Sequence, residues 1–277
     1  MMSVKTVFIT GCSSGIGYTT ALALKKRGHR VICSARKSED VSRLQGEGFE
    51  CLRLDLADSA SIQQAIAGLI AMTEGRIDAL FNNGAFGQPG AVEDLSRDAL
   101  RNQFETNFFG THELTNLLIP MMRRQGHGRI IYNSSILGFV AMKFRGAYIA
   151  SKFALEGLAD TLRLELQGSG IHIALIEPGP IESHFRQNAF AMYRQYIDPS
   201  RSVHKDTYLS MEERLQKPGP AAPFTLPATA VAEKVIHALE SRTPKSRYAV
   251  TFPTYLFAYL KRLLPTVWLD KILAAID

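Results

Sequence analysis

The sequence predicts an α/β protein with a doubly wound parallel sheet, covered by helices on both faces in a three-layer αβα arrangement. Short apolar runs alternate with longer stretches of helical period as far as Pro178, which is the pattern of repeated βαβ units. A glycine-rich turn follows the first apolar run directly, where a doubly wound sheet places one. With 277 residues, 46% hydrophobic and 21% charged, the chain is expected to form a single domain, residues 1–277.

Six apolar runs predict the strands of this sheet, at residues 7–10, 31–35, 51–54, 79–82, 130–134 and 173–176. They are continuous rather than alternating, as strands buried on both faces of a parallel sheet are. Helices are expected between them, including residues 15–27, 59–73, 97–124 and 147–167. Asp58, Ser59 and Ser96 are typical capping residues at the start of two of these stretches.

The pattern changes after Pro178. Residues 181–227 are rich in aromatics, Met, Pro and charge and contain no clean strand. They are therefore expected to form a helical substrate lid over the carboxyl edge of the sheet. A helix at residues 228–240 and a last strand at 248–251 are expected to complete the fold.

The C-terminal segment, residues 252–277, is apolar and helical by pattern but carries a Trp and several charges: Lys261, Arg262, Trp268 and Lys271. Pro265 and these charges break it too often for a membrane span. We expect it to pack against the lid or a second subunit, because exposed apolar patches commonly mark an interface. The alternative is a peripheral contact with a membrane surface, which basic amphipathic helices make.

Charge and cysteine usage exclude several classes of protein. The net charge is +6, but the basic residues are scattered along the chain, so no nucleic-acid partner is expected. Cys12, Cys33 and Cys51 form no CxxC pair and have no His cluster nearby, so neither a disulfide framework nor a metal site is expected. This usage, and a start without a signal-peptide pattern, predict a cytoplasmic protein.

The glycine-rich turn is the first motif that carries chemistry; it comprises Thr10, Gly11, Cys12, Ser13, Ser14, Gly15, Ile16 and Gly17. Gly11 permits a tight turn, Gly15 lets the backbone approach a pyrophosphate, and Gly17 lets helix and strand pack closely. The amino end of the following helix would face the anion.

The spacing TGxxxGxG departs from GxGxxG and resembles that of the short-chain dehydrogenase/reductase family. This resemblance covers the chain from Val4 to about Ser183 and implies a Rossmann-like fold with a nicotinamide cofactor. It implies cofactor contacts in the turn itself, from Gly11, Ser13, Ser14, Gly15, Ile16 and Gly17. Asn82, Asn83, Gly84 and Ala85 resemble the family's NNAG with Ala and Gly exchanged, and Asn83 is expected to bridge the central strands.

The end of the second strand distinguishes NAD from NADP, because an acidic residue there binds the free ribose hydroxyl and a basic one accommodates the extra phosphate. Ala35 stands where NAD-specific family members carry Asp, and Arg36 and Lys37 follow it. A guanidinium can hold a phosphate by two parallel hydrogen bonds. We therefore expect NADP as the cofactor.

Other cofactor contacts are implied by the resemblance. Asp55 matches the position that contacts the adenine, with Leu56 beside it, although Asp55 could equally be a helix cap. The turn after the sixth strand matches the family's nicotinamide-binding segment through Pro178, Gly179, Ile181 and Ser183.

Four residues resemble the family's catalytic tetrad: Asn107, Ser135, Tyr148 and Lys152. Tyr148 and Lys152 are four residues apart, so a helix places them on one face. The phenol would act as general acid or base, and a neighbouring ammonium would lower its pKa. Ser135 would donate a hydrogen bond to the substrate oxygen. The resemblance implies that Lys152 also binds the nicotinamide ribose and that Asn107 holds a water in a proton relay.

The expected reaction is reversible reduction of an aldehyde or ketone. Among relatives the pattern is most similar to bacterial NADP-dependent aldehyde reductases of the YbbO type, and next to hydroxysteroid and retinol dehydrogenases. A hydroxysteroid or retinol-type alcohol dehydrogenase and a non-catalytic NADP-binding sensor are the alternatives. Several apolar side chains are available to line a substrate cavity or to close the core: Phe139, Met142, Phe144, Phe185, Met192, Tyr193, Tyr196 and Tyr208. Family members suggest a homodimer or homotetramer.

Overall fold

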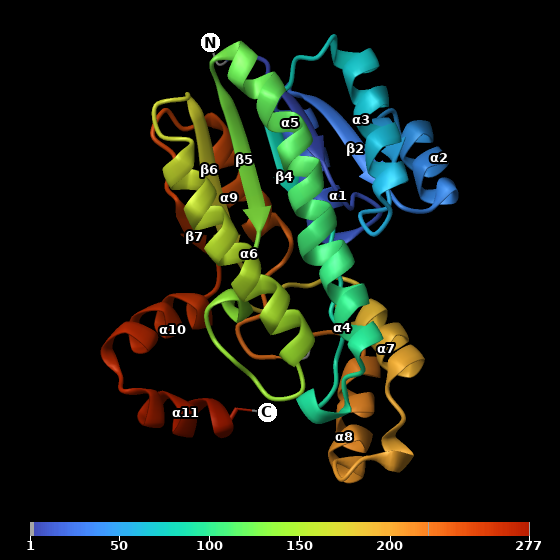
Figure 1. Cartoon of the computed structure of the whole chain (residues 1–277), viewed down its shortest axis with the longest axis vertical. Helices are drawn as coiled ribbons and strands as arrows, with labels where there is room; N and C mark the ends of the chain where they lie inside the picture. Colours follow the sequence, from blue (N-terminus) through green and yellow to red (C-terminus); the bar gives the residue numbers. More distant parts are fainter. Residues whose placement is uncertain (1–2, 221, 277) are drawn as a thin grey trace.

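The computed structural model describes residues 3–220 and 222–276 and contains a seven-stranded sheet in the order β3-β2-β1-β4-β5-β6-β7 (Figure 1). Every neighbouring pair of strands is parallel. The strands are β1 (Thr6–Ile9), β2 (Arg30–Ala35), β3 (Glu50–Arg53), β4 (Ala79–Asn82), β5 (Gly128–Asn133), β6 (Ile171–Glu177) and β7 (Arg247–Ala249). The order reverses between β1 and β4, which makes the carboxyl ends of these two strands the switch point of the sheet.

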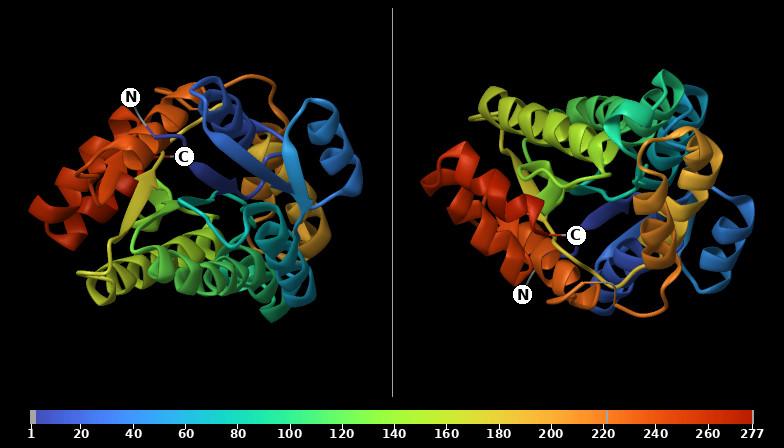
Figure 2. Two further views of the ribbon diagram at one scale, coloured as in Figure 1. Left: turned by 90° about the horizontal axis from the view of Figure 1, so that it is seen from above. Right: turned by 90° about the horizontal axis from the view of Figure 1, so that it is seen from below.

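Helices cover both faces of the sheet, as the end-on views in Figure 2 show. One face packs against α1 (Gly15–Lys26), α2 (Ser38–Gly46) and α9 (Thr229–Glu240), and the other against α3 (Ser59–Thr73), α5 (Thr111–Gln125) and α6 (Gly146–Glu165). Alternate residues of β1 serve the two cores, because Val7 and Ile9 belong to the first and Phe8 to the second. The predicted α/β class, with its Rossmann-like doubly wound sheet, is confirmed.

The helix predicted at residues 97–124 is interrupted. It consists of α4 (Arg97–Phe104), a π-helical segment η2 (Glu105–Gly110) and α5. Gly110 lies so close to the neighbouring chain that an added Cβ would be 1.7 Å from the carbonyl oxygen of Leu56. The single-helix prediction was therefore wrong at this point, because periodicity does not reveal a locally wider turn.

The segment that begins at Ile181 ends at Leu226, and its two ends lie side by side. Ile181 and Leu226 form an isolated parallel bridge, with hydrogen bonds from the Glu182 amide to the Leu226 carbonyl (3.0 Å) and from the Leu226 amide to the Pro180 carbonyl (3.1 Å). Between them lie α7 (Phe185–Tyr196), the short helix η4 (Pro199–Arg201) and α8 (Lys205–Gln216). Figure 1 shows α7 and α8 beyond the carboxyl edge of the sheet.

The last strand is shorter than expected, because Thr251 already occupies the amino cap of α10 (Phe252–Leu263). A second helix, α11 (Thr266–Ala274), follows, and the two form a hairpin beside the body (Figure 1). The inner side of this hairpin packs against η3 (Ile136–Gly138) and the loop after it. One more short helix, η1 (Val92–Asp94), lies between β4 and α4. Phe252 also contacts Phe224 near the end of the lid segment. Among the described residues, no helix combines the length and apolarity that a bilayer span needs.

A glycine substitution and its control test the close approach of η2 to the loop after β3. Gly110→Ala should destabilise the protein by about 1–3 kcal/mol, because the new methyl group has no room beside the Leu56 carbonyl. Gly157→Ala is the matched control, since nothing lies within 4 Å of an added Cβ there, and it should stabilise α6 by up to about 1 kcal/mol. Chemical denaturation measures both; equal effects would contradict the close contact.

Candidate functional site

The glycine turn after β1 is closely packed against the loop after β4. Gly11 has φ +70°, and a Cβ on it would lie 2.8 Å from the Cα of Gly84. A Cβ on Gly17 would lie 2.3 Å from the Gly11 carbonyl oxygen. Both positions therefore exclude any side chain, and the predicted roles of Gly11 in the turn and of Gly17 in helix–strand packing are confirmed.

Asn83 bridges the central strands, as predicted. Its Nδ2 donates to the carbonyl oxygens of Thr10 (2.9 Å) and Gly11 (3.1 Å), and its Oδ1 accepts from Nδ2 of Asn133 (2.9 Å). The Thr10 hydroxyl accepts from the backbone amides of Asn83 (2.9 Å) and Gly84 (2.8 Å). Thr10 was named as part of the turn but given no role, and Asn133 was not predicted, although each is a polar residue at the carboxyl end of an apolar run.

The amino end of α1 lies at the carboxyl edge of the sheet, directly after the glycine turn. Gly15 begins the helix with φ +57°, and Ser14 caps it without a side-chain hydrogen bond in the described chain. Ile16 packs its side chain into the core, and Gly15 lies against Ser183, which an added Cβ would approach to 3.2 Å. The backbone amides of a helix start and its dipole attract an anion. This cradle fits the pyrophosphate of a dinucleotide.

The basic residues after β2 are exposed beside this cradle. Arg36 and Lys37 are both accessible, and Lys37 pairs loosely with Glu39 at 3.7 Å. Arg43 of α2, which the sequence did not single out, donates from Nη2 to the Ser13 carbonyl at 2.6 Å. Three cationic side chains from the end of β2 and from α2 thus lie near the turn, where a phosphate on the adenosine ribose would be attracted.

Asp55 is not the cap of α3. Asp58 holds that position and accepts from the Ala60 amide at 2.9 Å, whereas Asp55 accepts from the Ala57 amide at 3.0 Å in the preceding turn. The capping alternative for Asp55 was therefore wrong. Leu56 buries its side chain beneath Gly84, 3.0 Å from an added Cβ.

Three of the four predicted catalytic residues meet at the carboxyl edge. Ser135 follows β5 and begins η3, while Tyr148 and Lys152 lie on α6. Ser135 lies close enough to Tyr148 to oppose the rise in the pKa of the phenol that burial causes. Lys152 Nζ lies 5.6 Å from the centre of the Tyr148 ring and donates to the Asn133 carbonyl at 2.7 Å. Phe185 covers the phenol from the lid side, with ring centres 5.3 Å apart.

Burial shifts both ionisable groups toward their neutral forms. It raises the pKa of Tyr148 to about 12 against the opposing hydrogen bond from Ser135. It lowers the pKa of Lys152 to about 8, against the opposing charge of Glu156. The expectation that Lys152 depresses the phenol pKa is therefore wrong for this structure, because burial is the main influence on the phenol and the ammonium is directed to the Asn133 carbonyl.

Asn107 lies in η2 and is fully buried. Its Oδ1 accepts from the Phe86 amide (3.1 Å), and its Nδ2 donates to the Phe86 carbonyl (2.9 Å) and to Oγ of Ser151 (3.2 Å). The side chain thus joins the loop after β4 to α6, one residue before Lys152. The water relay implied for Asn107 remains a prediction.

The turn after β6 closes the site from the other side. The Pro178 carbonyl accepts from the Ile136 amide at 2.8 Å and from the Ser135 hydroxyl at 3.5 Å. Gly179 has no room for a side chain, because an added Cβ would lie 2.1 Å from Oγ1 of Thr251. The turn is thereby held between the Ser135 segment and the start of α10.

A buried charge cluster lies next to Lys152 and was not predicted. Arg247 of β7 pairs with Glu156, with Glu177 (2.5 Å) and with Asp160 (2.6 Å). Glu156 follows Lys152 by one helical turn. Burial raises its pKa to about 7, with the Ser134 hydroxyl opposing the shift. The Arg247 guanidinium thus joins two carboxyl groups of α6 to the one at the end of β6, which fixes this part of α6 against the sheet.

The lid aromatics do not all face a cavity. Tyr193 and Tyr208 are buried in a separate cluster, where Tyr193 donates to Glu212 (2.8 Å) and Tyr208 to Asp94 (2.6 Å). Phe144 stacks edge-on against Tyr208. Of the two alternatives left open for these three side chains, the second is found, because they form the core that holds α7 and α8 to the body.

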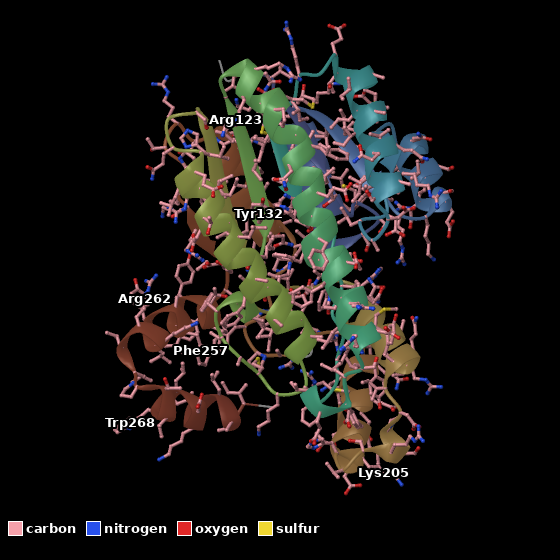
Figure 3. All side chains as sticks on the ribbon, viewed as in Figure 1. Arg123, Tyr132, Lys205, Phe257, Arg262 and Trp268 are labelled. Carbon is pink, nitrogen blue, oxygen red and sulfur yellow. The ribbon has the colours of Figure 1, made fainter. Side chains whose placement is uncertain are left out.

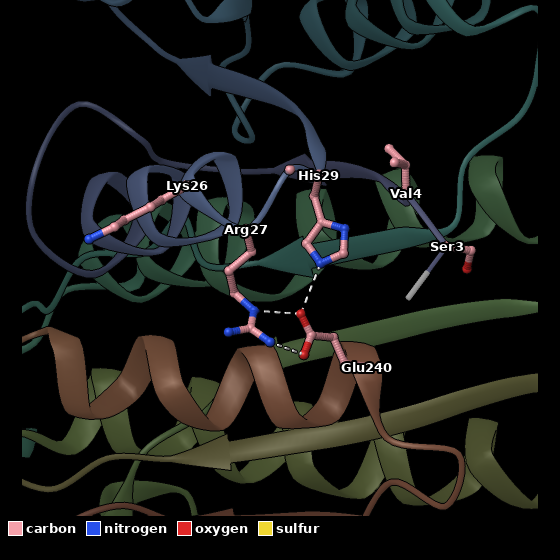
Figure 4. A pocket seen from close by; sticks show the side chains of 7 residues that line it. Ser3, Val4, Lys26, Arg27, His29 and Glu240 are labelled. Atoms are coloured by element: carbon pink, nitrogen blue, oxygen red, sulfur yellow. Dashed lines mark hydrogen bonds and ion pairs between the residues drawn. The ribbon is translucent and has the colours of Figure 1, made fainter. Parts of the chain in front are cut away.

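A cavity of about 610 Å³ lies at the opposite, amino end of the strands (Figure 4); its lining residues are Ser3, Val4, Lys26, Arg27, Gly28, His29 and Glu240. There Glu240 accepts from Arg27 (2.6 Å) and contacts the His29 ring (3.0 Å). Arg27, His29 and Glu240 are thus paired with one another, and none of the predicted site residues contributes to the cavity. The candidate site is therefore the carboxyl edge.

Comparison with known proteins extends these observations. Residues 5–194 match the sequence profile of the family described as short chain dehydrogenase. The uncharacterized oxidoreductase YbbO of Escherichia coli strain K12 is 44% identical over 269 residues, which cover 97% of this chain and 94% of that protein. Human retinol dehydrogenase 8 is 34% identical over 76% of this chain and 71% of its own length. A short-chain dehydrogenase structure from Streptomyces avermitilis has a TM-score of 0.73 at 27% identity, covering 99% of this chain and 100% of that one.

The charge cluster makes a prediction about pH. The pKa of Glu156 is raised from 4.5 to about 7, so its contribution to stability is complete below pH 4.5 and is lost as the pH rises through 7. Glu156→Gln stays neutral throughout. The unfolding free energy of this variant minus that of the parent should therefore increase between about pH 5 and pH 8, by on the order of 1–3 kcal/mol.

Asp160→Asn is the control of opposite sign. Burial raises the pKa of Asp160, but Arg163 and Arg247 outweigh it and lower the pKa below 3.8. This carboxylate therefore stabilises the fold at neutral pH, and the variant should be less stable than the parent there. Denaturant titrations at several pH values measure both variants, and a flat difference for Glu156→Gln would contradict the assignment.

Proposed function

The chain belongs to the short-chain dehydrogenase/reductase family, as its motifs predicted, and we propose that it is an NADP(H)-dependent oxidoreductase that interconverts an apolar aldehyde or ketone and its alcohol. The observation that carries this proposal is the meeting of Ser135, Tyr148 and Lys152 beside the glycine turn. A hydroxyl donor, a phenol and an ammonium in one buried corner are the groups that a carbonyl reduction needs.

The residues present fit a dinucleotide. The turn from Gly11 to Gly17 and the start of α1 would hold the pyrophosphate, and Arg36, with Lys37 nearby, would hold the ribose phosphate of NADP. Asp55 would contact the adenine, with Leu56 beside it. Lys152 would bind the nicotinamide ribose, and the turn of Pro178, Gly179, Ile181 and Ser183 the nicotinamide itself. The cofactor supplies or accepts the hydride when bound.

The protein side chains supply the proton. Tyr148 donates its phenolic proton to the oxygen of the carbonyl as that oxygen gains negative charge, and takes it back in the reverse direction. The Ser135 hydroxyl donates a hydrogen bond to the same oxygen. Asn107 would connect Lys152, which lies beside Tyr148 on α6, to solvent through a bound water.

The substrate class is inferred from the surroundings. Phe185 lies against Tyr148 and makes the approach to the phenol apolar. The human relative is named a retinol dehydrogenase, which also favours a long apolar aldehyde or alcohol. The three cysteines are free and buried, which supports the reducing cytoplasm as the compartment. Phe109 and Leu164 are exposed on η2 and α6 (50% and 58%), which supports a homodimer or homotetramer through these helices.

Replacing Tyr148 by Phe tests the mechanism. Turnover of a long-chain aldehyde should fall at least about 100-fold, the usual contribution of general acid catalysis, while NADPH affinity stays nearly unchanged. Tyr132→Phe is the control, because that buried tyrosine lies away from the site and bonds only weakly to Thr115 (3.4 Å). If Tyr148→Phe keeps most of its activity, the acid–base assignment is wrong; if the parent binds NADPH but reduces no carbonyl, a sensor is the better account.

Replacing Arg36 by Ala tests the cofactor. One charged hydrogen-bonded contact is worth about 1.5–3 kcal/mol, so NADPH affinity should fall roughly ten- to a hundredfold, while NADH affinity should hardly change. Lys37→Ala should have a smaller effect, because its ammonium already pairs with Glu39. Fluorescence titration of the parent and both variants with NADPH and NADH gives the six dissociation constants. A parent that binds both cofactors equally would overturn the NADP assignment.

A further inference from the structure

The hairpin of α10 and α11 presents an apolar surface to solvent. On α10 the exposed side chains recur every three or four residues and form one stripe, and α11 continues it. We call this the outer face; its members are Phe252, Tyr255, Leu256, Tyr259, Leu263, Val267, Trp268 and Ile272. Tyr259, Leu263 and Trp268 are 64%, 76% and 65% exposed. An apolar surface of this extent on one helical hairpin marks a contact rather than ordinary solvent exposure.

The opposite side of the hairpin is fixed to the body. Phe257 and Leu273 pack with Val140 in a small core. Lys261 donates to the Phe139 carbonyl (2.5 Å) and Lys143 to the Ala274 carbonyl (2.8 Å). Figure 3 shows Phe257 on the side of α10 toward the body and Trp268 at the margin of the molecule. The outer face is therefore held in place and not exposed by detachment of the hairpin.

The chemistry of the outer face fits an anionic lipid surface. Tyr255, Tyr259 and Trp268 combine apolar rings with a polar edge, and such side chains gather at membrane–water interfaces. Arg262 and Lys271 are exposed on the hairpin, and within its described part Asp270 is the one acidic residue. Burial raises the pKa of Glu177 in the body, and Arg262 is near enough to that carboxyl for its charge to oppose the rise. We propose that the outer face of α10 and α11 seats this protein on the surface of a bilayer containing anionic lipids.

A second copy of the chain fits this face less well. A twofold contact would bring the same patch of each copy together, so the basic side chains Arg262 and Lys271 would meet a patch of the same net charge. Anionic headgroups instead neutralise both residues while the rings enter the acyl boundary. The hairpin would lie along the membrane surface, since neither helix is long enough to cross it.

The position of the hairpin links this surface to the candidate site. Thr251 and Thr254 at the start of α10 pack against Gly179, and the inner side of the hairpin packs against the loop after Ser135. A bilayer on the outer face would thus be separated from the segments that flank the site by the hairpin alone. If the proposed function holds, an apolar substrate can pass from lipid to enzyme without crossing water; the lipid contact itself does not depend on that function.

Sedimentation with lipid vesicles tests the proposal. The full chain should bind vesicles of phosphatidylcholine mixed with phosphatidylglycerol, and bind pure phosphatidylcholine at least tenfold more weakly. Leu263→Ser with Trp268→Ser should lower the partition coefficient at least tenfold. The matched control is Val203→Ser with Leu209→Ser, which removes two equally exposed apolar groups (86% and 57%) from the lid segment and should leave binding unchanged.

Neutralising the charges completes the test. Arg262→Gln with Lys271→Gln should lower binding to the mixed vesicles about tenfold or more, since each basic residue near an anionic surface is worth roughly fivefold. Three results would overturn the proposal: no vesicle binding, equal loss in the control variant, or a concentration-dependent dimer that disappears with Leu263→Ser and Trp268→Ser. NADPH titration and turnover of a water-soluble aldehyde, measured without vesicles, report on the proposed function separately.

Discussion

The structure depends on a close backbone approach at the switch point of the sheet, held by one asparagine. Gly11 and Gly17 let the turn after β1, the start of α1 and the loop after β4 touch without side chains between them. The Asn83 side-chain amide donates to the Gly11 carbonyl and accepts from the side chain of Asn133. The backbone carbonyl of Asn133 in turn accepts from Lys152. A short chain of hydrogen bonds thus connects the phosphate cradle to the candidate catalytic lysine, so cofactor and acid–base groups share one rigid frame.

Burial of charge gives the same region its chemical character. Desolvation moves Tyr148 and Lys152 toward neutrality, and their pKa values of about 12 and 8 follow from it. Glu156 opposes this for Lys152 and is itself held by Arg247. In such low-dielectric surroundings a charge added near the phenol acts more strongly than it would in water. The protonation state of Tyr148 is therefore sensitive to whatever is bound beside it.

Local patterns predicted most of the fold and the motif residues. The spacing of Gly11 and Gly17, and the four-residue interval between Tyr148 and Lys152, are local features that a strand end and a helix translate directly into position. The π-helical segment at residues 105–110 was not predictable, because the contact of Gly110 with the Leu56 carbonyl joins parts of the chain far apart in sequence.

The charge cluster around Arg247 was missed for the same reason, and for the lid tyrosines the sequence left two alternatives open. Arg247 is brought to Glu156 by the pairing of β7 with β6. Nothing in the sequence near either residue indicates this ion pair. By type, Tyr193 and Tyr208 fitted either a cavity or the core. Their hydroxyls donate to Glu212 and Asp94, which satisfies them inside a core.

The most direct test of the central claim, that this protein transfers a hydride between NADP(H) and a carbonyl, is isotope transfer. Two samples of NADPH, each carrying deuterium in one of the two stereochemical positions at C4 of the nicotinamide, are incubated separately with the enzyme and a long-chain aldehyde. The mass of the alcohol product is measured by mass spectrometry. The account predicts one deuterium on the carbinol carbon, from one of the two labelled cofactors, for each NADPH oxidised; alcohol without deuterium from either cofactor, or no NADPH oxidation with any apolar carbonyl, would contradict it.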